Sequence, residues 1–118
     1  MRYALLICTD QSVAISAEEQ SRRITGLMSA QEQLRARGVL AGSELLQPAA
    51  AAVTVRAWDG GDIEIANGPA VRPKEHVTGV FTIDCGDLDE AIDLATKIPA
   101  AWYGTIEIRP VCGTQLDT

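Results

Sequence analysis

The six residues Tyr3–Cys8, with the sequence YALLIC, constrain the fold more than any other stretch of this chain. A strand with one covered face alternates apolar and polar side chains, whereas this run is apolar at both alternating positions. A strand of that kind is buried on both faces and lies inside a sheet. We therefore predict that Tyr3–Cys8 is a central strand, and that both faces of its sheet need cover.

Two stretches have the spacing of amphipathic helices. The first begins at Ser16, which forms an S-x-x-E capping box with Glu19, and runs to about Arg37, where Gly38 ends it. The second begins at Asp87, with Glu90 at the third helical position. The apolar positions expected to face the core are Ile24, Leu27, Met28 and Leu34 in the first helix, and Leu88, Ala91, Ile92, Ala95 and Ile98 in the second.

Five further segments have strand patterns, at residues 39–46, 53–57, 62–66, 80–83 and 104–109. The run Asp59-Gly60-Gly61-Asp62 joins the second and third of them as a hairpin turn. The order is β-α-β, a β-hairpin, then β-α-β, which predicts an α+β sandwich of the ferredoxin-like kind. We predict one domain over residues 1–112, followed by a flexible tail over residues 113–118.

Two helices cover only one face of such a sheet, yet the central strand is apolar on both. The economical cover for the second face is another copy of the same sheet, packed face to face across a two-fold axis. We therefore predict a homodimer.

Composition excludes several classes of protein. A net charge of −6 opposes direct binding to nucleic acid through phosphate contacts, and equally opposes an anionic membrane surface. No apolar run is long enough for a membrane span or a secretion signal, so we expect a cytoplasmic protein. The odd cysteine count, Cys8, Cys85 and Cys112, lacks C-x-x-C spacing, and it predicts buried or exposed free thiols without a disulfide, metal or cofactor.

The stretch 64–84 concentrates the polar chemistry of the chain. Asn67-Gly68-Pro69 is a strong turn signal, because glycine tolerates positive φ and proline fixes φ. Lys74, Glu75 and His76, the only histidine, follow this turn. A loop between two strands is a natural place for function. His76 is a candidate general acid or base, although a lone loop histidine is more often a surface residue.

Glu44 is the second candidate for chemistry, because it lies among apolar residues in a strand that looks buried. A buried carboxylate needs a cation or hydrogen-bond donors, and Arg56, Lys74 and Arg109 are candidate partners. One hypothesis is that Glu44, Arg56 and Lys74 converge on one ligand cavity with Asn67 at its rim. The alternative is a structural ion pair that fixes strand register. For Trp58, Trp102 and Tyr103 we expect core packing rather than a pocket lining.

The chain resembles the YCII-related proteins, in particular the branch with the DGPF domain, from Arg2 to Val111. The matching segments are Arg2–Ile7, Gly42–Pro48, Thr54–Arg56, Asn67–Ala70, Lys74–Glu75, Asp87–Ala91, Ile98–Pro99, Tyr103–Gly104 and Glu107–Pro110. The resemblance implies a ferredoxin-like fold that dimerises as an α+β barrel, and for some members an accessory role beside alternative sigma factors. Two positions depart from the family pattern. Asp-Gly-Pro-Phe reads Asn67-Gly68-Pro69-Ala70 here, and no position matches the His/Asp pair of smaller relatives.

Three functions stay open from the sequence. The first is a small-molecule-binding or enzymatic dimer with a pocket near Glu44. The second is an accessory module that contacts a sigma factor or another regulator. The third is a dimeric scaffold without surviving chemistry, which the altered motif suggests. No nucleophile motif, phosphate loop or metal spacing decides between them.

Overall fold

A four-stranded antiparallel sheet forms the body of the molecule, and β1 (Arg2–Thr9) lies inside it, as predicted. The computed structural model describes residues 1–113. The strand order is β2-β5-β1-β6, with β2 at Leu40–Leu45, β5 at His76–Asp84 and β6 at Thr105–Pro110. Apart from Gly113, the predicted tail lies outside the described residues. The ferredoxin-like α+β class is confirmed.

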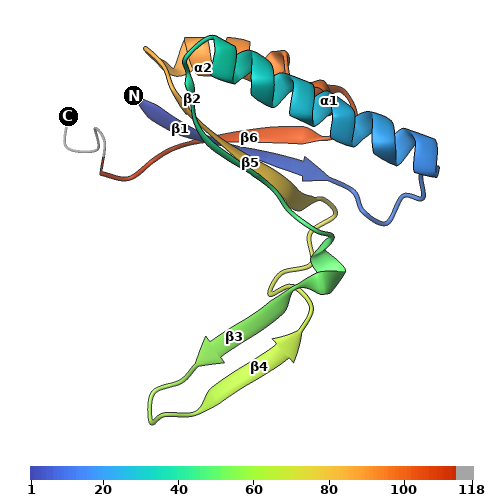
Figure 1. Ribbon diagram of the computed structural model, residues 1–118. Helices are drawn as coiled ribbons and strands as arrows, with labels where there is room; N and C mark the ends of the chain where they lie inside the picture. Colours follow the sequence, from blue (N-terminus) through green and yellow to red (C-terminus); the bar gives the residue numbers. More distant parts are fainter. Residues whose placement is uncertain (114–118) are drawn as a thin grey trace.

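Helices α1 (Ala17–Ala36) and α2 (Leu88–Thr96) lie on the same face of this sheet (Figure 1). Both caps form as predicted, because the Ser16 hydroxyl accepts from the Glu19 N–H at 3.0 Å and the Asp87 carboxylate accepts from the Glu90 N–H at 2.9 Å. The Glu19 carboxylate does not complete a capping box, since it pairs with Arg22 and Arg23 instead. Gly38 has φ +76°, the left-handed conformation expected of it.

The core lies between the helices and the inward-facing residues of the two central strands. On β1 these residues are Tyr3, Leu5 and Ile7, and on β5 they are Phe81 and Ile83. Leu27 and Leu34 of α1 pack against them as predicted, but Ile24 and Met28 are exposed. Gly26 lies against Pro99, whose Cγ would be 3.4 Å from an added Cβ. Pro99 opens the short 3₁₀ turn η2 (Pro99–Trp102), so the neighbour of Gly26 is this turn rather than the sheet.

The opposite face of the sheet carries no helix, and we call it the open face. Its centre is apolar, with half-buried Ala4, Leu6 and Val80. Arg2 binds Asp84 through two hydrogen bonds of 2.7 and 2.9 Å at its margin. The cover expected for this face is therefore absent from a single chain, and the homodimer stays a prediction.

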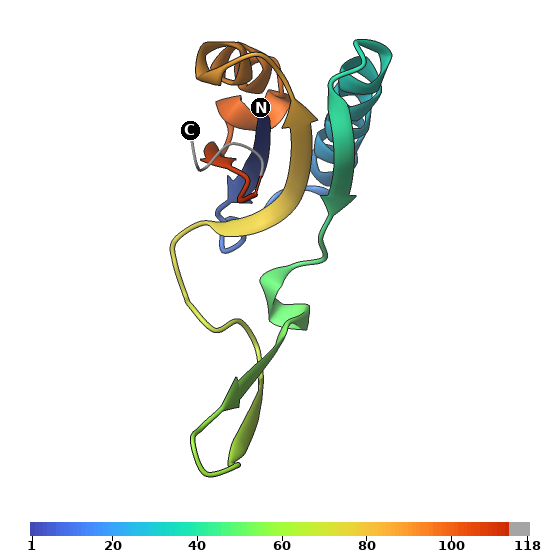
Figure 2. The ribbon, with the colours of Figure 1, turned by 90° about the vertical axis from the view of Figure 1, so that its left-hand side faces the viewer.

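Strands β3 (Val53–Ala57) and β4 (Ile63–Asn67) pair only with each other and project from the body as a separate ribbon (Figures 1 and 2). We call this ribbon the arm. The hairpin turn forms as predicted, and the Trp58 N–H donates to the Asp62 carbonyl at 2.8 Å. Strand β3 is mostly exposed, because the arm leaves the sheet and touches no second layer.

Two predicted core aromatics are also exposed. Trp58 lies on the arm and is 53% exposed, while Trp102 ends η2 and is 86% exposed. Tyr103 is half-buried. Their aromatic character alone did not indicate burial, which depends on the element that carries them.

Candidate functional site

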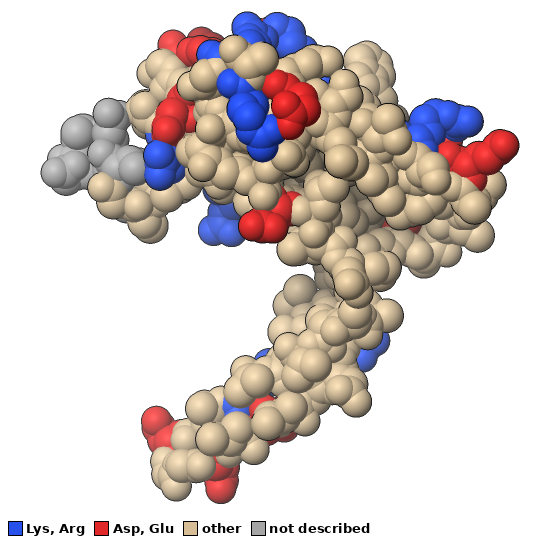
Figure 3. Space-filling view, viewed as in Figure 1, with Lys and Arg blue, Asp and Glu red and all other residues tan. Residues whose placement is uncertain are grey.

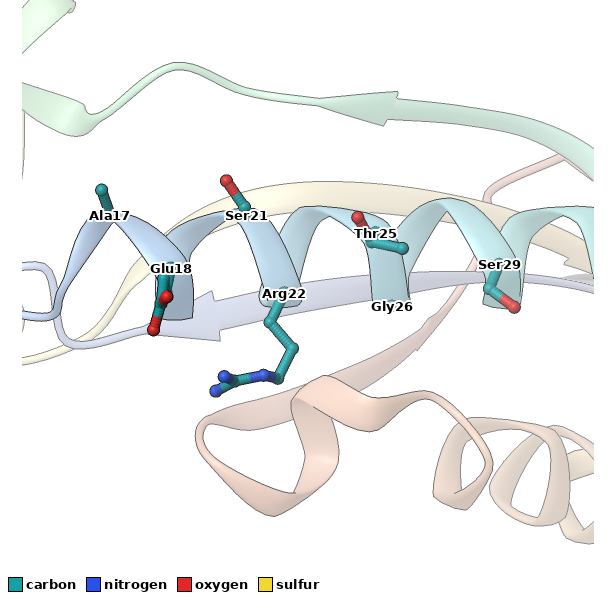
Figure 4. A pocket seen from close by; sticks show the side chains of 7 residues that line it. All are labelled: Ala17, Glu18, Ser21, Arg22, Thr25, Gly26 and Ser29. Carbon is teal, nitrogen blue, oxygen red and sulfur yellow. The ribbon is translucent and has the colours of Figure 1, made fainter.

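A wide hollow of about 820 Å³ along α1 is not a convincing site. Figure 4 shows that its lining side chains come from one helix, α1, and most of them are small, such as Ser21, Thr25 and Ser29. Arg22, its one cation, is paired with Glu19 of the same helix. The hollow therefore lacks a facing wall and a free cation.

Charged and titratable side chains cluster instead where the end of β1 meets the start of β5. The two strands are antiparallel, so Thr9 pairs with His76 and Asp10 follows directly. A bulge between Ile7 and Cys8 shifts the register, with Ile7 opposite Gly79 and Cys8 opposite Val77. Bulges re-aim side chains beside functional sites. Without it His76 would lie opposite Asp10; the bulge places it opposite Thr9, one residue further into the sheet.

A hollow of about 330 Å³ at this end is lined by Asp10, Ser12, Arg72, Lys74 and His76, among others. Asp10 accepts hydrogen bonds from the Ser12 hydroxyl at 2.6 Å and from the Ser12 N–H at 3.0 Å. These bonds lower the pKa of Asp10, and the charges of Lys74 and His76 lower it further. Asp10 is therefore an ionised carboxylate that interacts electrostatically with Lys74 and His76.

The two cations of this hollow are not neutralised by the chain itself. Arg72 and Lys74 are exposed, and in the described part of the chain neither belongs to an ion pair. Glu75, which lies next to Lys74, is engaged elsewhere, because its carboxylate accepts from the Thr105 hydroxyl at 2.6 Å. Two unpaired cations and a histidine against one carboxylate favour a bound anion, although the whole chain carries a net charge of −6.

A second, larger hollow opens between α1 and the sheet beside the first one. Its volume is about 520 Å³, and its apolar walls include Ile15, Leu27, Leu45 and Leu46. Pockets of this size and character take small organic ligands. We call it the apolar cleft.

One charged group faces the apolar cleft from α1. The Arg23 guanidinium lies 4.0 Å from the centre of the Tyr103 ring and donates to Glu19 at 3.0 Å. Burial raises the pKa of Tyr103, against the opposing effect of Arg23. The Tyr103 phenol therefore stays neutral at physiological pH, as a polar group in a mostly apolar wall.

The polar hollow and the apolar cleft are contiguous, because Asp10 and Gln11 line both. The Gln11 side chain accepts a hydrogen bond of 2.9 Å from the Ala49 N–H, which ties the loop after β1 to the 3₁₀ turn η1 (Ala49–Ala51). A third hollow of about 400 Å³ shares His76 and Pro69 with the polar hollow. The result is one groove with a charged end and an apolar end.

The predicted site residues are not all brought together. Lys74 and His76 share the polar hollow, and Pro69 from the Asn67-Gly68-Pro69 turn lines it as well. Asn67 is the last residue of β4, and Arg56 lies on the arm, 5.8 Å from the Trp58 ring. Neither lines any of the hollows described above.

Glu44 is exposed, which corrects the expectation of a buried carboxylate. It lies on edge strand β2 opposite Val80, on the open face, where no helix covers it. Within the described chain its carboxylate has no hydrogen bond or ion pair, and it does not line the groove. A single chain therefore does not bring Glu44, Arg56 and Lys74 to one cavity.

Sequence reasoning missed Asp10, Arg72 and Arg23, and it assigned Tyr103 to core packing although Tyr103 lines the apolar cleft. A signal for Asp10 existed, because ferredoxin-like topology pairs the first strand with the strand after the hairpin, antiparallel. That pairing brings Asp10, the residue after Thr9, close to His76. No local signal pointed to Arg23 and Tyr103, which meet only through the packing of α1 on the sheet end.

Within the described residues, Cys8, Cys85 and Cys112 are free thiols. Burial raises the pKa of the Cys8 thiol, and Glu107 and Glu75 raise it further, so this thiol is protonated and a poor nucleophile. Among residues 1–113, no group of three or more His, Cys, Asp or Glu side chains is placed to hold a metal ion. Over the same residues, no helix has the length and apolar character needed to span a membrane.

A family model described as the YCII-related domain matches residues 1–114. The chain belongs to the YCII-related family. An uncharacterized protein of Rhizobium meliloti (strain 1021) is 36% identical to it over 115 residues, which cover 94% of this chain and 92% of that protein. The resemblance stated from the sequence is thus confirmed at the level of the YCII-related family, and the DGPF branch stays a prediction.

Proposed function

We propose that this YCII-related protein binds a small organic anion in the groove at the end of β1 and β5. The anionic group lies at Arg72 and Lys74, and the apolar part of the ligand enters the apolar cleft under α1. The observation that carries this proposal is the meeting of unpaired cations, His76 and Asp10 in one hollow that is continuous with an apolar cleft.

The same geometry supports acid–base chemistry on the bound molecule. An imidazole accepts and donates protons near neutral pH, and an ionised carboxylate lines the same hollow. Asp10 is held ionised by Ser12, so it stabilises a protonated imidazole rather than acting as the acid. In this proposal His76 transfers the proton and Asp10 supports its charge.

His76 makes binding directly measurable, because it is the only histidine of the chain and its ring signals in NMR have no overlap. Three probes separate the contributions: benzoate has charge and ring, benzyl alcohol has the ring without the charge, and acetate has the charge alone. We expect saturable shifts of the His76 signals with benzoate at the lowest concentration. Removing one charge-assisted contact, in Lys74→Gln or Arg72→Gln, should weaken benzoate binding about tenfold or more.

Glu44→Gln is the discriminating control. If benzoate binding weakens in Glu44→Gln and not in Lys74→Gln, the site lies on the open face near Glu44 and the groove proposal fails. Absence of any saturable shift at His76 would also contradict it.

One observation favours the alternative of an accessory module for a sigma factor or another regulator. The arm presents exposed apolar side chains away from the body, which is the mark of a protein-binding surface. In that case the arm, rather than the groove, would carry the function, and substitutions at Lys74 and Arg72 would leave partner binding unchanged.

A further inference from the structure

Asn67 is the only asparagine of the chain, and a glycine follows it. It is the last residue of β4 and is exposed. The amide carbon of an asparagine side chain is open to attack by the backbone nitrogen of the next residue. The attack is least hindered when that residue is glycine, which has no Cβ. Asn67 is therefore the position where this chain is open to spontaneous deamidation.

The reaction needs no reagent other than water. The Gly68 nitrogen bonds to Cγ of Asn67, and the Cγ–Nδ2 bond breaks. The proton of the Gly68 N–H passes through water to the departing nitrogen, which leaves as ammonia, and a succinimide ring remains. Water then opens the ring at either carbonyl carbon and gives aspartate or isoaspartate. Both products carry a carboxylate in place of a neutral amide.

The folded arm restrains the attacking nitrogen. The Gly68 N–H donates to the Ala52 carbonyl at 2.7 Å, and the Gly68 carbonyl accepts from the Thr54 hydroxyl at 2.7 Å. Both backbone groups of Gly68 are thus bound to the other side of the arm. The nitrogen cannot lose its proton and turn toward Asn67 while these bonds hold. Succinimide formation therefore requires the base of the arm, where Gly68 meets Ala52, to open.

The base of the arm is also where opening costs little free energy. Strands β3 and β4 pair only with each other, and a lone two-stranded hairpin is marginally stable in water. Figure 3 shows the arm joined to the body by a narrow neck. Segments of this kind open locally while the rest of the protein stays folded. The reaction rate is then the rate in an unrestrained chain multiplied by the fraction of time that the base is open.

The new carboxylate arises beside one of the two unpaired cations of the polar hollow. A Cβ added at Gly68 would lie 3.9 Å from Nη2 of Arg72, so the guanidinium lies against the residue that follows Asn67. Arg72 lines the polar hollow, and within residues 1–113 it belongs to no ion pair. A carboxylate at position 67 gives this cation a partner within the chain, and that partner competes with a bound anion.

We propose that Asn67 is a modification site, at which deamidation limited by opening of the arm adds a carboxylate that competes for Arg72 and weakens anion binding in the polar hollow. The weakening rests on the proposed function, whereas the modification does not. The change runs in one direction, because the ammonia is lost to solvent. Each chain therefore passes once from a form that binds anions more tightly to a form that binds them less tightly.

Mass spectrometry at mildly alkaline pH tests the modification. The wild type should gain the small mass that replacement of NH2 by OH produces, confined to the peptide that contains Asn67. Asn67→Gln should not gain it, because the longer side chain closes a ring far more slowly. Thr54→Val removes one hydrogen bond to Gly68, keeps a β-branched residue and should convert up to about fivefold faster. Thr82→Val, on β5 in the body, is the matched control and should convert at the wild-type rate.

The chain unfolded in urea supplies the rate without the restraint. The folded wild type should convert about tenfold more slowly, as expected for a hairpin of marginal stability. Equal rates in the folded and the unfolded chain would overturn the restraint by the arm, and so would equal rates for Thr54→Val and Thr82→Val. A folded wild type that never converts while the unfolded chain does would overturn the site itself.

Asn67→Asp creates the aspartate product directly and tests its effect on binding. Half-saturation of the His76 signals should need up to about fivefold more benzoate than in the wild type, the limit for an exposed ion pair. Asn67→Gln should bind as the wild type does. Gln33→Glu adds the same charge on α1, away from the polar hollow, and controls for net charge.

Failure of the modification and failure of the proposed function are distinguishable. If Lys74→Gln weakens benzoate binding and Asn67→Asp does not, competition for Arg72 is refuted. If Gln33→Glu weakens binding as much as Asn67→Asp does, the effect is one of net charge and the competition is again refuted. If the wild type shows no saturable binding, the proposed function fails, while the mass measurement still decides whether Asn67 is modified.

Discussion

Gly104 is the position where a single added methyl group should do the most damage near the site. It lies between η2 and β6, and its N–H donates to the Ala100 carbonyl at 2.8 Å. A Cβ at this position would be 2.3 Å from the Cys8 carbonyl oxygen and 3.0 Å from Cγ2 of Thr9. The first contact is with the backbone of the central strand, which cannot rotate away as a side chain does.

We expect Gly104→Ala to cost about 3 kcal/mol, the upper end of the usual penalty for overpacking, because the strained atoms belong to two backbone segments held by hydrogen bonds. For a domain of this size the loss corresponds to a fall in Tm of roughly 10 °C or more. The strain falls on Cys8 and Thr9, directly before Asp10, so the groove should be disturbed together with stability.

Gly42→Ala is the matched control on the same sheet. A Cβ added at Gly42 meets nothing within 4 Å, and its φ is not in the left-handed region. Its free energy of unfolding should stay within about 0.5 kcal/mol of the wild type. Urea denaturation of all three proteins at one protein concentration measures the difference, because a dimer's stability depends on concentration. Equal midpoints for Gly104→Ala and Gly42→Ala would refute the reasoning.

Two further predictions concern the loop after β1 and the start of α1. Because Ser12 and the nearby cations lower the pKa of Asp10, its contribution to stability is present above the unfolded value of 3.8 and is lost as pH falls through the lowered pKa. Asp10→Asn should therefore be less stable than the wild type at neutral pH, with a difference in urea midpoint that shrinks on acidification; a difference independent of pH would contradict this. Ser16→Ala should lower the free energy of unfolding by about 1 kcal/mol, because the helix loses its cap. Ser21→Ala, within α1, is the control and should leave stability unchanged. Thermal melts compare the two variants, and equal Tm values would show that the cap is unimportant.

Local sequence patterns predicted most of the helices and strands correctly. The double apolarity of Tyr3–Cys8 indicated a central strand, and β1 has neighbours on both sides. Ser16 and Asp87 marked the helix starts within one residue, because a cap depends only on side chains and backbone groups three positions apart. The two-helix count also indicated correctly that one face of the sheet would lack a helix.

Burial was predicted less well, since it depends on what lies opposite a strand rather than on the strand itself. The strand at Val53–Ala57 was predicted correctly, but its pattern did not indicate that it leaves the main sheet as an arm. Glu44 looked buried because its neighbours are apolar, yet it lies on an edge strand and points to the open face. A sequence pattern states which side chains share a face and does not state what covers that face.

The sequence by itself determined the order of the elements, their caps and turns, and the family to which the chain belongs, because each of these depends on residues a few positions apart. Only the tertiary structure decided the site. Asp10 and His76 are distant in sequence and meet through the pairing of β1 with β5 and the bulge within it. Arg23 reaches Tyr103 through the packing of α1 on the sheet end. Contacts of this kind are set by the arrangement of whole elements, which many weak interactions fix together and no short segment encodes alone.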